Sequence, residues 1–154
     1  KTMSRRLKSS FLAAFLIVSL AAVLQLKIGL GTSLYPSFTL VALIASAFFL
    51  DFSSLVFLAI FSALILNWRP GLSPEILVLI SLPIAVSIFR KFLPVQAWLN
   101  FALVFVLGFS VFYSVAGFPG LLKNFNLLFK DLIISMVFAA PAFLILKRFH
   151  ASKI

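Results

Sequence analysis

The residues best suited to chemistry stand together in one short break between apolar segments. Asn67, Trp68, Arg69 and Gly71 follow a run of aliphatic side chains, and Glu75 comes shortly after them. An amide, a guanidinium and a carboxylate this close together can bind an anionic or polar ligand, or contact a partner protein. The alternative is an ordinary membrane exit, where tryptophan and arginine lie at the lipid headgroups and a proline-glycine pair turns the chain.

Side chains that could perform catalysis are few. The acids are Asp51, Glu75 and Asp131, and each maps to a different loop or span end, so no pair of carboxylates shares a helix face. The single histidine, His150, lies among basic residues, whereas metal sites need several ligands. The chain has no cysteine, and we find no phosphate-binding loop, serine-hydrolase motif or zinc-protease motif. We therefore expect no enzyme: no catalytic residue, no metal and no cofactor.

The composition is that of a protein surrounded by membrane lipids. Of the 154 residues, 64% are hydrophobic and 10% are charged, and 20 are phenylalanine. Soluble domains are about 45–50% apolar and about 25% charged, so this chain has too few charged side chains to cover a water-facing surface. The net charge of +10 does not indicate nucleic acid, because the basic residues lie in short breaks between apolar runs and form no continuous basic face.

The apolar runs predict six membrane-spanning helices, since about 20 apolar residues are needed to cross the hydrocarbon core. The second and third spans come from one long apolar stretch interrupted only by Asp51. A hairpin at this residue keeps its carboxylate out of lipid, where insertion would cost about 2.5–3.5 kcal/mol. The expected spans are about 10–26, 37–50, 53–68, 74–89, 95–115 and 132–146.

The distribution of basic residues predicts the orientation. With six spans, nine of the 13 Lys and Arg residues lie on the side of the two termini and four lie on the other side. Basic residues accumulate on the cytoplasmic side of membrane proteins. The expected fold is therefore an all-α integral membrane protein. Its six transmembrane helices form one domain over residues 1–154, and both termini are cytoplasmic.

Small residues and prolines inside the spans predict how the helices pack. Pairs of small residues four positions apart let neighbouring helices approach closely in lipid. Pro83 and Pro141 lie inside the fourth and sixth spans, where they are expected to kink the helices. The three pairs of small residues are Ala42 and Ser46, Ala59 and Ala63, and Ser110 and Ser114.

The segment 118–131 has apolar and polar residues on opposite faces of a helix. This pattern predicts an interfacial amphipathic helix before the last span, and a partner-docking element is the alternative. Within the spans the buried polar candidates are Gln25, Asn67, Asn100 and Tyr113. Ion-coupled transporters normally carry ionisable residues inside their spans, so the absence of any away from the span ends disfavours this class.

The order of these features resembles the rod-shape-determining MreD family of bacterial inner-membrane proteins. Pro36 opens the second span, Asn67 closes the third and is followed by Gly71, and the sequence PAFLILKRF runs from Pro141 to Phe149. The family usually has aspartate where this chain has Asn67, and its Ser-Gly ending is replaced here by Arg-Pro-Gly. The resemblance implies a non-enzymatic scaffold of the cell-elongation (rod-shape) machinery. Its partners would be an MreC-like protein and the complex of RodA with a penicillin-binding protein.

A second family shares the small size, the six spans and a proline-led second segment: the substrate-binding S components of energy-coupling-factor vitamin transporters. Here Trp68, Arg69, Glu75 and Asn126 would all face the non-cytoplasmic side and could converge on a vitamin. The segment 118–131 would form a lid. The partners implied by this alternative are transporter ATPases and a vitamin.

Overall fold

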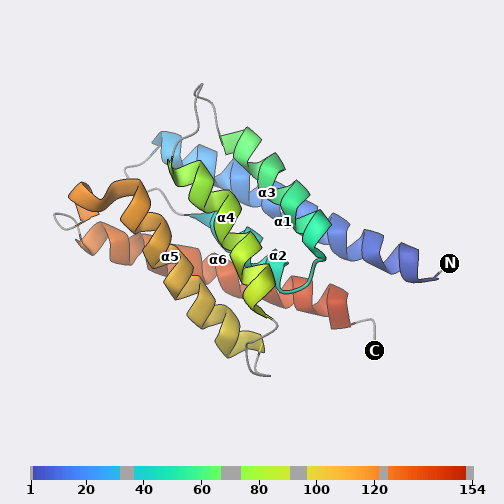
Figure 1. Cartoon of the computed structure of the whole chain (residues 1–154). Coiled ribbons are helices and arrows are strands. Elements are labelled where there is room, and N and C mark those ends of the chain that lie inside the picture. The colour runs from blue at the N-terminus through green and yellow to red at the C-terminus, as the bar shows by residue number, and fades with distance from the viewer. Residues whose placement is uncertain (1, 32–36, 67–73, 91–96, 122–124, 152–154) are drawn as a thin grey trace.

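The chain folds as a bundle of helices (Figure 1). The computed structural model describes residues 2–31, 37–66, 74–90, 97–121 and 125–151, and these contain no strand. Two helices contain segments long and apolar enough to cross a membrane, at Ser10–Lys27 and Phe129–His150. The six helices in the described part are α1 (Thr2–Gly31), α2 (Phe38–Ala47), α3 (Phe52–Leu66), α4 (Pro74–Phe89), α5 (Ala97–Leu121) and α6 (Phe125–Ala151).

The all-helical class is confirmed, and the fourth helix has the predicted bounds of 74–89. The hairpin at Asp51 is also present, because α2 ends shortly before this residue and α3 begins directly after it. The second helix is shorter than predicted. It has ten residues, and Phe48 to Leu50 form a turn whose backbone N–H groups donate to carbonyls of the last helical turn.

The prediction of a separate amphipathic helix at 118–131 is wrong. Residues 118–121 belong to the end of α5, and residues 125–131 form the first turns of α6, which continues without a break to Ala151. The alternation of apolar and polar residues has the same helical period whether a helix lies on a membrane or leads into a span. The pattern therefore identified helical structure correctly but could not show where each helix begins and ends.

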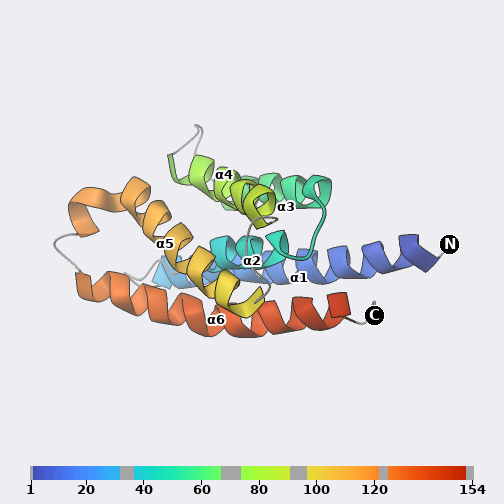
Figure 2. The same ribbon diagram turned by 60° about the horizontal axis from the view of Figure 1, so that its bottom comes forward.

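The helices alternate in direction along the chain. Rings of α1 and α3 pair in the same order, Phe11 with Phe57 and Phe15 with Phe61, so these helices run parallel. In α2 and α6, Phe38 contacts Phe138 and Phe49 contacts His150, and these helices are also parallel to each other. The start of α1 and the end of α6 consequently lie at the same end of the bundle (Figure 2).

The short helix α2 lies at the centre of the bundle (Figure 2). It contacts all the other helices, and each of its ten residues is buried. Ten residues extend only about 15 Å, which is half the hydrocarbon thickness. Both ends of α2 therefore lie among other helices, and their backbone groups need partners from neighbouring elements.

Phenylalanine rings fill the space around the C-terminal end of α2. Phe101 of α5 stacks on Phe143 of α6 with a centroid distance of 4.6 Å, and both contact Phe48 edge to face. Phe49 packs on Phe143 at 5.1 Å. Such ring pairs add about 0.5–1.5 kcal/mol each beyond their buried area, which helps to hold α2, α5 and α6 together.

Two of the three predicted small-residue pairs are buried, and the third is not. Ala42 and Ser46 lie in the core, as do Ala59 and Ala63. The remaining pair, Ser110 and Ser114 on α5, is exposed in the described part of the chain, so its predicted role in packing against another helix stays a prediction. Their hydroxyls donate to the carbonyls of Val106 and Ser110, within α5 itself.

The close approach of α5 occurs at Gly108 instead. A Cβ atom at this position would lie 2.9 Å from Leu82 Cδ2 on α4 and 3.1 Å from Ile44 Cδ1 on α2. Gly108 faces the bundle together with the buried rings of Phe105 and Phe109, whereas the two serines lie on the opposite side of the helix. The two prolines expected to bend helices, Pro83 and Pro141, are inside α4 and α6 as predicted, the first buried and the second exposed.

Candidate functional site

Polar side chains gather at the N-terminal end of α2, which is otherwise surrounded by apolar groups. Gln25 of α1 accepts a hydrogen bond from the backbone N–H of Thr39, with its Oε1 atom 3.0 Å from the nitrogen. Ser37 is the N-cap residue, but its side chain makes no capping bond. The side-chain amide of Gln25 therefore takes the place of a local cap. It accepts from one of the backbone N–H groups that every helix leaves without a partner in its first turn.

A buried carboxylate lies at the same end of the bundle. Asp131 of α6 is 5% exposed, and its Oδ2 atom accepts a hydrogen bond of 2.9 Å from the Tyr113 hydroxyl of α5. The Tyr113 hydroxyl also lies beside the hydroxyl of Ser37, without the geometry of a hydrogen bond. Tyr113 thus connects α6 with the start of α2. We call Gln25, Ser37, Thr39, Tyr113, Asp131 and Ser135 the α2 polar cluster.

Asp131 lies near the end of an apolar segment, as expected, but it is buried. It is the seventh residue of α6 and belongs to the segment Phe129–His150, which is long and apolar enough to cross a membrane. A carboxylate that is buried at the end of such a segment needs polar partners, and buried ionisable residues often mark functional sites. The one carboxylate with a buried environment is therefore the strongest single indication of function in the described part of the chain.

The C-terminal end of α2 is held by Arg90, directly after α4. Its Nη1 atom donates to the carbonyl oxygens of Ala47 at 2.7 Å and Leu50 at 3.0 Å. The carboxylate of Asp51 is nearby and is attracted to the same guanidinium. A cation at a helix C-terminus interacts favourably with the helix dipole and occupies carbonyls that have no partner within the helix.

Asp51 directly precedes the first residue of α3. Its Oδ2 atom accepts from the Ser54 backbone N–H at 3.2 Å, and its Oδ1 atom accepts from the Ser54 hydroxyl at 2.8 Å. Partial burial raises the pKa of Asp51, but the hydrogen bonds from Ser54 and the charge of Arg90 lower it more, so the pKa lies below its usual value. The carboxylate is thus an ionised helix cap next to a positive charge.

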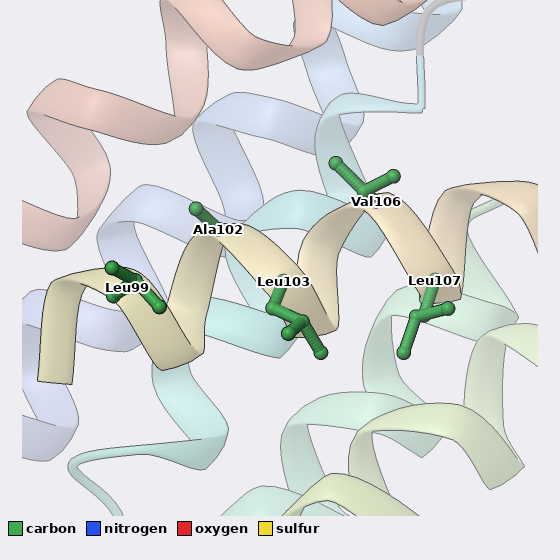
Figure 3. A pocket seen from close by; sticks show the side chains of 5 residues that line it. All are labelled: Leu99, Ala102, Leu103, Val106 and Leu107. Carbon is green, nitrogen blue, oxygen red and sulfur yellow. The ribbon is translucent and has the colours of Figure 1, made fainter. Parts of the chain in front are cut away.

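A shallow groove runs along the exposed face of α5 (Figure 3). All of its lining side chains come from this one helix, and all are apolar. A groove of this kind offers no hydrogen-bonding group to a polar small molecule. It fits an apolar side chain or an acyl chain instead. The lining residues are Leu99, Ala102, Leu103, Val106 and Leu107.

Most of the predicted contact site lies outside the described residues, namely Asn67, Trp68, Arg69 and Gly71. Glu75 is exposed in the first turn of α4. Asn126 is exposed near the start of α6. The structure thus brings together a different set of polar residues from the set that the sequence favoured.

Sequence reasoning found two members of the α2 polar cluster and missed the others. Gln25 and Tyr113 stood out as polar residues within apolar spans. Asp131 was placed at the end of a surface helix, because the polar residues just before it have the pattern of an interface. Asp131 and Tyr113 are 18 residues apart, so no short sequence pattern could predict that they contact each other.

Among the described residues, no three histidine or acidic side chains are grouped so that they could hold a metal ion. Comparisons of the chain with protein-family models, with curated proteins and with solved structures found no match.

Proposed function

We propose that the chain is a multi-pass protein of the bacterial inner membrane, with six spans and cytoplasmic termini. Support comes from its outer surface, where large apolar side chains are exposed on α1 and on α3 to α6. Leu64 and Val137, for example, are exposed by 72% and 70%. A water-soluble domain rarely exposes contiguous apolar patches over most of its helices, whereas a bilayer covers such a surface. The alternating helix directions agree with this topology.

Within that membrane we propose that the protein is a non-enzymatic scaffold, as its resemblance to the MreD family implies. The observation that carries this proposal is the outward face of α5. It combines the apolar groove around Leu103 with two exposed serines, Ser110 and Ser114, whose hydroxyls are bonded within the helix. Small residues on a lipid-facing surface allow a second helix to approach closely, and the internally bonded hydroxyls add no desolvation cost.

The partner proposed for this face is a membrane helix of an MreC-like protein, with the RodA and penicillin-binding protein complex assembled around it. Specificity would come from helix packing, because the groove has no charged or polar lining. The chain would then hold other membrane proteins in a fixed arrangement without taking part in a reaction.

Site-specific photocrosslinking in cells tests the scaffold. A photoreactive residue at Leu103 is expected to crosslink to an MreC-like protein, and the same residue at Leu77 of α4 is the matched control. Leu103 and Leu77 are equally accessible, at 50% and 53% exposure, but only Leu103 lines the groove. Equal crosslinking from both positions, or crosslinking to lipid alone, would contradict the proposal.

The S component of a vitamin transporter remains a second candidate because of the α2 polar cluster. Its side chains meet at the end of the bundle that is proposed to be non-cytoplasmic, where such a protein would take up its substrate. Purification from native membranes separates the two proposals. Paired ATPases in the purified complex would favour the transporter, and an MreC-like protein would favour the scaffold.

A further inference from the structure

Hydroxyl groups around the N-terminal end of α2 are buried without a hydrogen-bond partner. Ser37 Oγ, Thr39 Oγ1 and Ser135 Oγ all belong to residues that are at most 1% exposed. Burying a hydroxyl without a partner is unfavourable, and native proteins rarely leave several together. Ser37 and Thr39 stand at the start of α2 and Ser135 on α6, and a polar partner at these hydroxyls would remove the cost of burying them.

Ser135 differs from four other serines of the described helices, whose hydroxyls bond within their own helix. Ser46 and Ser62 each donate to the carbonyl oxygen four residues earlier, as do the exposed serines of α5. Ser135 makes no such bond although it is fully buried, and the hydroxyls of Ser10 and Ser19 on α1 also have no hydrogen-bond partner. Its oxygen lone pairs are therefore available to a ligand.

The oxygens converge from three helices. Ser135 lies one turn after Asp131, so both side chains are on the same buried face of α6. Tyr113 of α5 donates to Asp131 and lies beside Ser37 at the start of α2. Tyr113 thus links the carboxylate of Asp131 to the serine at the start of α2, and Ser135 follows Asp131 by one turn on α6.

We propose that this position binds a monovalent cation, for which Na⁺ is the probe. All the candidate ligands are oxygen atoms, which prefer hard cations. The carboxylate of Asp131 repels an anion, and the site has one acid, whereas divalent cations usually take several carboxylates. The helix dipole of α2 opposes a cation, but one of its free N–H groups is already bonded to Gln25.

This inference goes beyond the scaffold and does not depend on it. A bound cation would join α2, α5 and α6 at the end of the bundle opposite Arg90, so the central helix would be fixed at both ends. The scaffold needs only the outer face of α5, and the two proposals can fail separately.

Thermal unfolding of the purified full-length chain in detergent micelles tests the site. We expect the Tm in NaCl to exceed the Tm in choline chloride at the same ionic strength by about 5 °C, because a ligand bound only by the folded state stabilises it. LiCl and KCl should give different rises from NaCl. Equal Tm values in all four salts would overturn the proposal and would mean that the hydroxyls bind water only.

Variants locate the cation. Ser135→Ala and Asp131→Asn should each abolish the difference between NaCl and choline chloride, while Ser114→Ala, which changes an exposed serine, should retain it. If Asp131→Asn does not fold, the double variant with Ser37→Ala and Ser135→Ala decides the question. A sodium-dependent rise of unchanged size in that double variant would contradict the assignment.

Discussion

Arg90 Nη1 lies 2.7 Å from the carbonyl oxygen of Ala47, so a side chain at the end of α4 closes the C-terminus of the central helix α2. The same nitrogen donates a hydrogen bond to the carbonyl oxygen of Leu50 in the turn that follows. Gln25 performs the corresponding task at the other end of α2 by accepting from Thr39 N–H. These two side chains supply partners for backbone groups that a helix leaves unpaired at its ends.

Replacing Arg90 should destabilise the bundle. Arg90→Ala leaves two carbonyl oxygens without their charged donor, and we expect the free energy of unfolding to fall by about 2–3 kcal/mol. Arg90→Lys should recover only part of this loss, since an ammonium group lacks the planar fork of a guanidinium. Thermal unfolding in micelles measures the change. Arg148→Ala, at an exposed position of α6, is the control and should have little effect.

Gln25→Leu should also weaken the fold, by about 1–3 kcal/mol, because the N–H of Thr39 loses its acceptor in a place where water cannot replace it. Val23→Leu changes an exposed residue of the same helix and should leave the Tm unchanged. Circular dichroism during heating gives both values. If the two variants unfold at the same temperature, Gln25 does not cap α2.

The fold was largely predictable from the sequence, because long apolar runs and the charged breaks between them directly determine helix positions. The bounds of α4 and the hairpin at Asp51 follow from this pattern. The pairings that make the candidate site were not predictable. Arg90 and Ala47 are 43 residues apart, and a basic residue at a helix end equally fits a membrane surface. Ser110 and Ser114 have the spacing of a packing motif, yet spacing does not show which face of α5 is turned inward.

The pH dependence of stability should reveal the Asp51 cap. Its pKa is lowered in the folded protein, so its stabilisation is complete above its ordinary pKa of 3.8 and is lost as the pH falls through the lowered value. Asp51→Ala should cost about 1 kcal/mol at pH 7, a value limited by solvent exposure of the carboxylate.

The difference between wild type and Asp51→Ala should shrink once Asp51 is protonated. Tm measurements of both proteins at neutral and acidic pH provide the test. Asp51→Asn serves as control, because asparagine can cap α3 without a titratable group. A wild-type advantage that grows as the pH falls would contradict this assignment.

The effect of a substitution at Gly108 on stability should depend strongly on the size of the new side chain. Gly108→Ala brings a methyl group against the ends of two flexible side chains, Leu82 and Ile44, and the better helix propensity of alanine offsets part of the strain. Gly108→Leu should lower the free energy of unfolding by about 1–3 kcal/mol through overpacking. Ser110→Leu, on the exposed side of α5, should leave stability unchanged but reduce capture of the proposed partner. Equal stability of Gly108→Leu and Ser110→Leu would show that α5 is oriented differently.

The two caps of α2 also imply an order of assembly during synthesis. Gln25 precedes α2 in the chain, so the N-terminal cap is present as soon as the helix is made. Arg90 is 40 residues beyond Leu50. At about 5–20 residues per second, the ribosome needs about 2–8 s to supply it. Throughout that interval the growing chain carries a short helix whose C-terminal carbonyls lack the charged donor that follows α4.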